Sequence, residues 1–185
     1  MFNLSTQDVV SSIEKTPLVN LDGIYFQEYK NFFGNNLLEH FSDLENLDYI
    51  PLPNQEDKPR MMVAYSEKIM KELTVFFMHS TITKSLSKKF GIDLKFASVD
   101  VWRDGKGYNL TPHTDDKRVK LAVQIYLGED SLGTSLFAMD KKTTIKTFEY
   151  TKDCGYALLN NERSVHGLDG VVKNDGRLSL YARYR

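Results

Sequence analysis

The second half of the chain consists of short runs in which apolar and polar residues alternate, and no other feature of the sequence constrains the fold as strongly. Glycines fall between these runs or at their ends, where turns form. A side-chain period of two is that of a β-strand, and many evenly spaced short strands are typical of a β-sandwich or a jelly-roll barrel. The runs are 95–103, 119–127, 135–138, 144–150, 156–160, 164–168 and 177–185.

Two of these runs each carry one strongly apolar face, which can pack under helices. The opposite face of 119–127 carries Ala122, Gln124 and Tyr126. The opposite face of 177–185 carries Arg177, Ser179, Tyr181, Arg183 and Arg185. Such faces meet solvent in an open sheet, or they line an interior pocket if the sheet closes into a barrel. The metal motif described below favours the pocket.

The first half has mainly helical patterns. Ser5 and Asp8 form a capping-box pattern before a helical stripe that Pro17 ends, and the ranges 35–47 and 67–90 are amphipathic. Gly91 occupies the position of a helix C-terminal glycine. Short strands are expected at 19–26, around a turn at Asp22-Gly23, and at 61–65, with a proline-marked loop between them. We predict a single domain, 1–185, in which 1–92 supports a β-rich catalytic core of 93–185. The prolines of the expected loop are Pro51, Pro53 and Pro59.

Composition and charge exclude several classes of protein. The 24 basic and 25 acidic side chains give a net charge of −1, so there is no global attraction to nucleic acid or to an anionic membrane. A single cysteine, Cys154, rules out an intrachain disulfide and a Cys-rich metal site. No long apolar run and no signal-peptide pattern is present, so we expect an intracellular, cytoplasmic protein. Oligomeric state cannot be read from these features.

Two histidines and one aspartate have the types and the spacing of metal ligands. His113 and Asp115 form an H-x-D triplet, and residues two apart on an extended segment project to the same side. His166 lies on a later run that a closed barrel brings alongside. Two imidazoles and one carboxylate leave three positions of an octahedral ion open, which suits non-haem iron(II). In the simpler interpretation, His113 is a loop residue and Asp115 a turn former. We expect no metal ligand among His40, His79 and Cys154.

Arg177 strengthens the metal interpretation because it follows His166 by 11 residues and shares a strand face with Ser179. Its planar guanidinium can bind a carboxylate through two parallel hydrogen bonds, and Ser179 can donate another from the same face. The alternative is an exposed strand arginine in an ion pair.

Together these residues resemble the H-x-D…H…R-x-S signature of the iron(II)- and 2-oxoglutarate-dependent oxygenases. The resemblance covers about residues 95–185 and is specific for the superfamily, not for one substrate. Further segments are similar to the prolyl-4-hydroxylase-like branch and its small bacterial and phage relatives. These segments are Ile125-Tyr126-Leu127, Gly133-Thr134 and Arg163-Ser164-Val165-His166-Gly167.

The resemblance implies a mainly β protein: a double-stranded β-helix, or cupin-like jelly roll, packed against N-terminal helices. It implies that iron(II) is held by the catalytic residues His113, Asp115 and His166, and that 2-oxoglutarate and dioxygen are co-substrates. The implied reaction hydroxylates a C–H bond of a small-molecule or peptidyl substrate and forms succinate and carbon dioxide. The residues expected to bind 2-oxoglutarate are Arg177, Ser179, Tyr126 and Gln124. Tyr126 can instead be a packed core aromatic.

Three other functions remain open at this point. Pro59-Arg60, Asp116 and the spacing of Arg177 and Arg183 are similar to AlkB-type nucleic-acid demethylases, which need a basic path for the strand. A non-catalytic double-stranded β-helix that only binds a ligand is a second alternative, and a cupin-like enzyme without 2-oxoglutarate is a third. The glycine-rich range 102–111 is expected to be a loop bordering the entrance. Its residues Arg103 and Asp104 then contact substrate or serve as turn residues.

Overall fold

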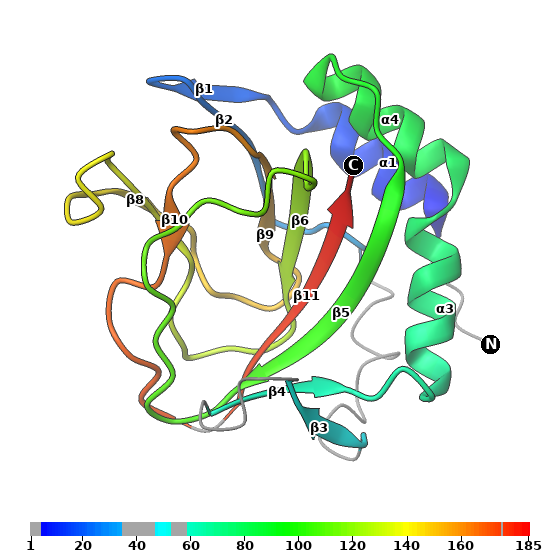
Figure 1. The fold of residues 1–185 in the computed structure, drawn as a ribbon. Helices are drawn as coiled ribbons and strands as arrows, with labels where there is room; N and C mark the ends of the chain where they lie inside the picture. Colours follow the sequence, from blue (N-terminus) through cyan, green and yellow to red (C-terminus); the bar gives the residue numbers. More distant parts are fainter. Residues whose placement is uncertain (1–4, 35–46, 53–58, 175) are drawn as a thin grey trace.

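A large antiparallel sheet dominates the computed structural model, which describes residues 5–34, 47–52, 59–174 and 176–185 (Figure 1). Its strand order is β1-β2-β9-β6-β11-β5-β4-β3. In chain order, these strands are β1 (Val19–Leu21), β2 (Ile24–Tyr29), β3 (Tyr49–Pro51), β4 (Arg60–Val63), β5 (Phe96–Asp104), β6 (Leu121–Tyr126), β9 (Gly155–Leu159) and β11 (Arg177–Tyr184).

A smaller sheet faces the large one and has the order β10-β7-β8. Its strands are β7 (Ser135–Phe137), β8 (Thr144–Thr147) and β10 (His166–Gly167). Between the two sheets lies an apolar cluster in which the ring of Phe148 stacks on Tyr156, with centroids 4.3 Å apart, and meets Phe26 edge-on at 5.4 Å. Two facing antiparallel sheets around such a core are the arrangement expected of a jelly-roll barrel.

In the described part of the chain, three helices cover the outer face of the large sheet: α1 (Thr6–Lys15), α3 (Lys68–Phe77) and α4 (Ser80–Phe90) (Figure 1). The apolar face predicted for the run 119–127 packs under them, as expected. The core cluster there combines Leu121, Val123, Ile125 and Leu180 with Leu73, Phe77, Ile82 and Leu86. Among the described residues, no helix combines the length and the apolar character needed to cross a bilayer.

Local chemistry explains where several elements begin and end. The Ser5 side chain accepts a hydrogen bond from the Asp8 amide and caps α1. Asp22 and Gly23 both have positive φ angles, 51° and 85°, which a tight turn between β1 and β2 requires. The helical range predicted over 67–90 divides into α3 and α4, and His79 caps the second helix by accepting from the Thr81 amide. Gly91 ends α4 with φ 68°.

Two loop predictions were wrong. Pro51, expected in a loop, belongs to β3; this is an edge strand, where a residue without an amide hydrogen is tolerated. The start of the loop predicted at 102–111 is strand: the run predicted at 95–103 continues through Asp104, because residues 102–104 pair with β4 on one side and β11 on the other. The helix predicted at 35–47, with His40, lies almost entirely outside the described residues, and so does Pro53.

Candidate active site

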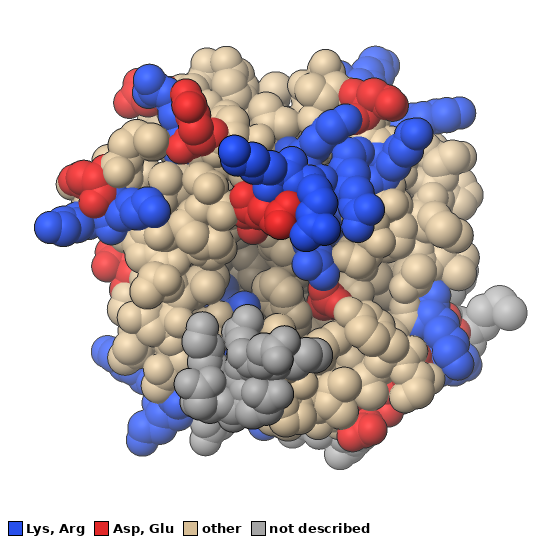
Figure 2. Space-filling view, viewed as in Figure 1, with Lys and Arg blue, Asp and Glu red and all other residues tan. Residues whose placement is uncertain are grey.

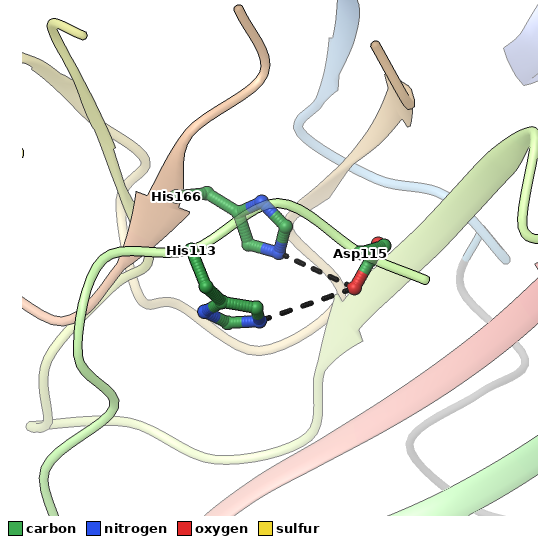
Figure 3. Close-up of side chains that lie close together, drawn as sticks. All are labelled: His113, Asp115 and His166. Atoms are coloured by element: carbon green, nitrogen blue, oxygen red, sulfur yellow. Dashed lines mark ion pairs between the residues drawn. The ribbon is translucent and has the colours of Figure 1, made fainter. Parts of the chain in front are cut away.

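Three side chains of the predicted metal motif converge inside the barrel (Figure 3). His113, Asp115 and His166 each offer one potential ligand atom, and these atoms lie within 4.8 Å of one another. The Nε2 atoms of His113 and His166 are 4.0 and 3.8 Å from Oδ1 of Asp115. The structure therefore brings together the two imidazoles and the carboxylate that the sequence motif predicted.

Backbone pairing brings the two histidines side by side, although they lie on segments far apart in the chain. The amide of each residue donates to the carbonyl of the other, at 2.9 and 2.8 Å, in an isolated β-bridge. Gly167 permits this approach, because a Cβ at that position would lie 2.5 Å from the Leu110 carbonyl oxygen. The glycine after His166 is thus required by the close passage of the segment that leads to His113.

Both imidazoles have the orientation of metal ligands. Nδ1 of His113 lies 2.9 Å from the Thr111 carbonyl oxygen, and Nδ1 of His166 lies 2.9 Å from that of Ser164. Because a carbonyl oxygen only accepts, each Nδ1 must carry a proton, and in the neutral imidazole Nε2 then keeps a free lone pair on the side of Asp115. Burial lowers the pKa of His166 below its usual range and favours the neutral, ligating form.

The second oxygen of Asp115 is held by Tyr181 on β11. The Tyr181 hydroxyl donates to Oδ2 at 2.7 Å, and its ring stacks on Trp102 of β5 at 4.8 Å. Burial raises the pKa of Tyr181 well above its ordinary value, so the phenol keeps the proton that it donates. Oδ1 of Asp115 is the oxygen that faces both histidines.

Three charged residues form a buried row across the neighbouring strands β4, β5 and β11. Arg60 of β4 and Arg177 of β11 both lie directly opposite Asp104 of β5. Nη1 of Arg177 is 2.8 Å from Oδ2 of Asp104, while Nε and Nη2 of Arg60 lie 2.5 and 3.0 Å from the two carboxylate oxygens. All three side chains are at most 7 % exposed. The row therefore carries one surplus positive charge away from water.

Arg177 is fixed by further contacts. Its Nε donates to the Leu132 carbonyl at 2.7 Å and its Nη2 to the Thr134 hydroxyl at 3.2 Å. Burial is the largest influence and lowers the pKa of Arg177, but Asp104, Tyr126 and Tyr150 together raise it above its ordinary value. The predicted exposed-arginine alternative is wrong, because this guanidinium is 1 % exposed.

The other residues predicted to bind the co-substrate lie near Arg177 on the same interior face. Ser179 is opposite Tyr126 in the sheet, is fully buried, and its hydroxyl has no hydrogen-bond partner among the described residues. The Tyr126 hydroxyl accepts from the Thr134 amide at 2.8 Å and still has its own proton to donate. Gln124 accepts from Thr134 and from Tyr156 at 3.0 and 2.6 Å.

A cavity of about 150 Å³ opens at the metal motif, and Figure 2 shows a hollow beside a gathering of Lys and Arg side chains. Asp116 and Val119, on the loop before β6, line it together with Arg60, Gln124 and the triad. Exposed cations of this loop and of the adjacent ends of β5 and β11 form what we call the basic rim. Its residues are Lys95, Lys117, Arg118, Lys120 and Arg185. Asp116 partly offsets it through an ion pair with Arg118 at 2.9 Å.

Sequence reasoning did not assign Arg60 or Tyr181 to the site, and it placed Asp104 in an entrance loop. Asp104 neither faces solvent nor makes a turn; it is a fully buried strand residue between two arginines. The sequence contains a usable signal for these ion pairs. Asp100 and Asp104 share one face of β5, Arg177 and Arg183 share one face of the neighbouring β11, and the two strands form the ion pairs Arg177–Asp104 and Arg183–Asp100.

No family model and no curated protein matches the chain. Several solved structures match it in fold. HygX from Streptomyces hygroscopicus, crystallised with nickel, 2-oxoglutarate and hygromycin B, matches with a TM-score of 0.62 at 14% identity, over 97% of this chain and 87% of HygX. A Pseudomonas putida prolyl-4-hydroxylase matches with a TM-score of 0.60 at 14% identity, over 98% of both chains. SnoN, a non-heme alpha-ketoglutarate-dependent epimerase from nogalamycin biosynthesis, matches with a TM-score of 0.63 at 12% identity, over 97% of this chain and 82% of SnoN.

These structural likenesses confirm the predicted fold class. The chain has the jelly-roll, double-stranded β-helix fold of the 2-oxoglutarate- and iron(II)-dependent oxygenases, prolyl-4-hydroxylases among them. At identities of 12 to 14% they establish the fold and leave the reaction and the substrate open.

The hydrogen bond from Tyr181 to Asp115 predicts a weaker metal site when it is removed. Tyr181→Phe keeps the ring on Trp102 but loses the hydroxyl, so we expect metal affinity to fall about 10- to 100-fold. Calorimetric titration with Mn²⁺ measures this change. Tyr65→Phe is the matched control, because the Tyr65 hydroxyl bonds Asp100 and no residue of the triad. Equal affinities for wild type and Tyr181→Phe would show that this bond does not position Asp115.

Proposed function

We propose that this protein is an iron(II)- and 2-oxoglutarate-dependent dioxygenase that hydroxylates a C–H bond of its substrate. The observation that carries the proposal is the pairing of two sites in one barrel interior. One is the His113, Asp115 and His166 motif with both Nε2 atoms free, and the other is the buried row with surplus positive charge. Iron(II) bound with 2-oxoglutarate and dioxygen supplies the oxidising chemistry and yields succinate and carbon dioxide.

The charges of the two sites match those of the co-substrate. A divalent ion with Asp115 carries one net positive charge, and the row of Arg60, Asp104 and Arg177 carries another. 2-Oxoglutarate has two carboxylates, one for each site. The buried, unpartnered hydroxyl of Ser179 adds support, because a polar atom in such a place requires a partner that the described residues do not supply.

Each residue of the proposed site then has a defined role. His113, His166 and Asp115 hold the ion, while Tyr181 fixes the carboxylate that contacts it. Arg177 binds the distal carboxylate of 2-oxoglutarate, with Ser179 and Tyr126 as further donors and Gln124 lining the same pocket. Burial of these groups excludes water, which strengthens every charged contact.

The substrate is proposed to be a small molecule or a peptidyl side chain that reaches the cavity past the basic rim. HygX, which has the same fold, was crystallised with the small molecule hygromycin B, and the Pseudomonas putida protein is a prolyl-4-hydroxylase. The basic rim itself favours a second candidate, an AlkB-type nucleic-acid demethylase, because it offers cations to a phosphate backbone. Arg183 distinguishes the two candidates.

The assignment predicts turnover of 2-oxoglutarate that depends on the triad. Purified protein with iron(II) is expected to convert 2-oxoglutarate to succinate slowly even without added substrate. His113→Ala should abolish succinate formation, as measured by chromatography. Cys154→Ser is the control, because its thiol donates to the Lys30 carbonyl, away from the triad, and activity should stay near wild type. Equal loss in both variants would mean that the site is misplaced.

The anchor assignment predicts unequal effects of two arginines on the same strand face. Arg177→Ala should weaken 2-oxoglutarate binding by about 2–5 kcal/mol, because a buried carboxylate loses its charged partner. Arg177→Lys should also raise the apparent KM, since the planar fork is lost while the charge stays. In both variants metal binding should persist.

Arg183→Ala is the comparison. Arg183 already forms an ion pair with Asp100, so the hydroxylase proposal expects little change in 2-oxoglutarate affinity. In the AlkB-type candidate Arg183 is a second anchor, and Arg183→Ala should weaken 2-oxoglutarate binding about as much as Arg177→Ala does. Wild-type affinity in Arg177→Ala would refute the co-substrate assignment, whatever metal the site holds.

A further inference from the structure

Arg60 stands out because the proposed function counts its charge but gives its side chain no contact with the metal or the co-substrate, yet it lines the cavity at the triad. Its guanidinium lies over two aromatic rings, 4.3 Å from the centroid of Trp102 and 4.2 Å from that of Tyr108. Contacts with both rings and two hydrogen bonds to Asp104 fix it in place. A cation held this firmly, at 6 % exposure, is a built feature of the site rather than a surface charge.

Asp104 would cancel the charge of Arg177 if Arg60 were absent. Its Oδ2 receives hydrogen bonds from Arg177 and Arg60 together, and its Oδ1 receives the remaining bond from Arg60. One carboxylate is therefore shared by two guanidinium groups. Only this sharing leaves the buried row positive, and a buried surplus charge is favourable only when an anion compensates it.

From this geometry we infer that Arg60 is a positioning residue for co-substrate binding: it engages Asp104 and thereby leaves Arg177 free to bind a carboxylate. The inference rests on the proposed function and adds to it a residue from β4, outside the motif-bearing strands. It predicts that the net charge of the row, and not Arg177 alone, determines the affinity for 2-oxoglutarate.

A charge-rescue experiment tests this inference. Arg60→Gln leaves Asp104 paired with Arg177, so the row is neutral, and we expect 2-oxoglutarate to bind Mn²⁺-loaded protein on the order of 10- to 100-fold more weakly. Adding Asp104→Asn to that variant restores a net charge of plus one on Arg177. Affinity is then expected to return to within a few-fold of wild type. Calorimetry gives both dissociation constants, and the Mn²⁺ affinity should stay unchanged throughout.

Two further variants separate charge from packing. Arg60→Lys keeps the positive charge without the fork, and it should retain more affinity than Arg60→Gln. Arg103→Gln is the matched control. Arg103 immediately precedes Asp104 in β5, but its guanidinium lies over Tyr49 and not in the row. This variant should bind 2-oxoglutarate with wild-type affinity. Thermal unfolding establishes that each variant is folded.

The possible outcomes are distinct. Wild-type affinity in a folded Arg60→Gln variant would overturn the inference, and so would a double variant that binds no better than the single one, because charge would then not be the cause. If Arg177→Ala loses affinity while Arg60→Gln does not, the proposed function stands and only the role of Arg60 falls. If the wild-type protein binds no 2-oxoglutarate, both fall together.

Discussion

The alternation of side chains along β11 is the constraint on which the rest of the site depends. One face of the strand, with Leu180 and Ala182, packs into the core beneath the helices. The other face carries Arg177, Ser179 and Tyr181 into the barrel interior. A slip of one residue in the register of β11 would exchange the two faces and bury three polar side chains among apolar ones. Pairing with β5 and β6 on both sides excludes that slip.

The same strand sets the distance between the two ends of the site. Tyr181 contacts the Asp115 carboxylate, Arg177 belongs to the charged row, and Ser179 lies between them. Four residues of an extended strand span about 13 Å between Cα atoms. The large sheet thus provides the row and the support for Asp115, while the bridge between His113 and His166 provides the histidines. A site divided between two sheets is formed only when the barrel closes.

Much of this arrangement could be predicted from the sequence, for reasons that are local. Period-two alternation shows which residues share a strand face, and the H-x-D triplet with His166 and Arg177 predicts the chemistry proposed for that face. The same reasoning reached Ser179 and Tyr126, and the structure places both near Arg177.

The rest depends on pairings that no local pattern determines. Arg60 and Asp104 are 44 residues apart, and their ion pair requires the register of three strands at once. The predicted loop 102–111 overlapped the end of the predicted strand run 95–103 because glycines follow at 105 and 107; pairing on both sides extends the strand to Asp104. Pro51 was misplaced for a similar reason, since only its position at a sheet edge makes a proline acceptable there.

The central claim is that a metal ion and a buried cationic row act together on one dianionic co-substrate. Calorimetric titration of 2-oxoglutarate into metal-free and Mn²⁺-loaded protein tests it most directly. The account predicts one equivalent of 2-oxoglutarate bound tightly to the loaded protein and much more weakly to the metal-free protein, because each site holds one carboxylate. Equal affinity in both forms, or no binding to the loaded form, would contradict it.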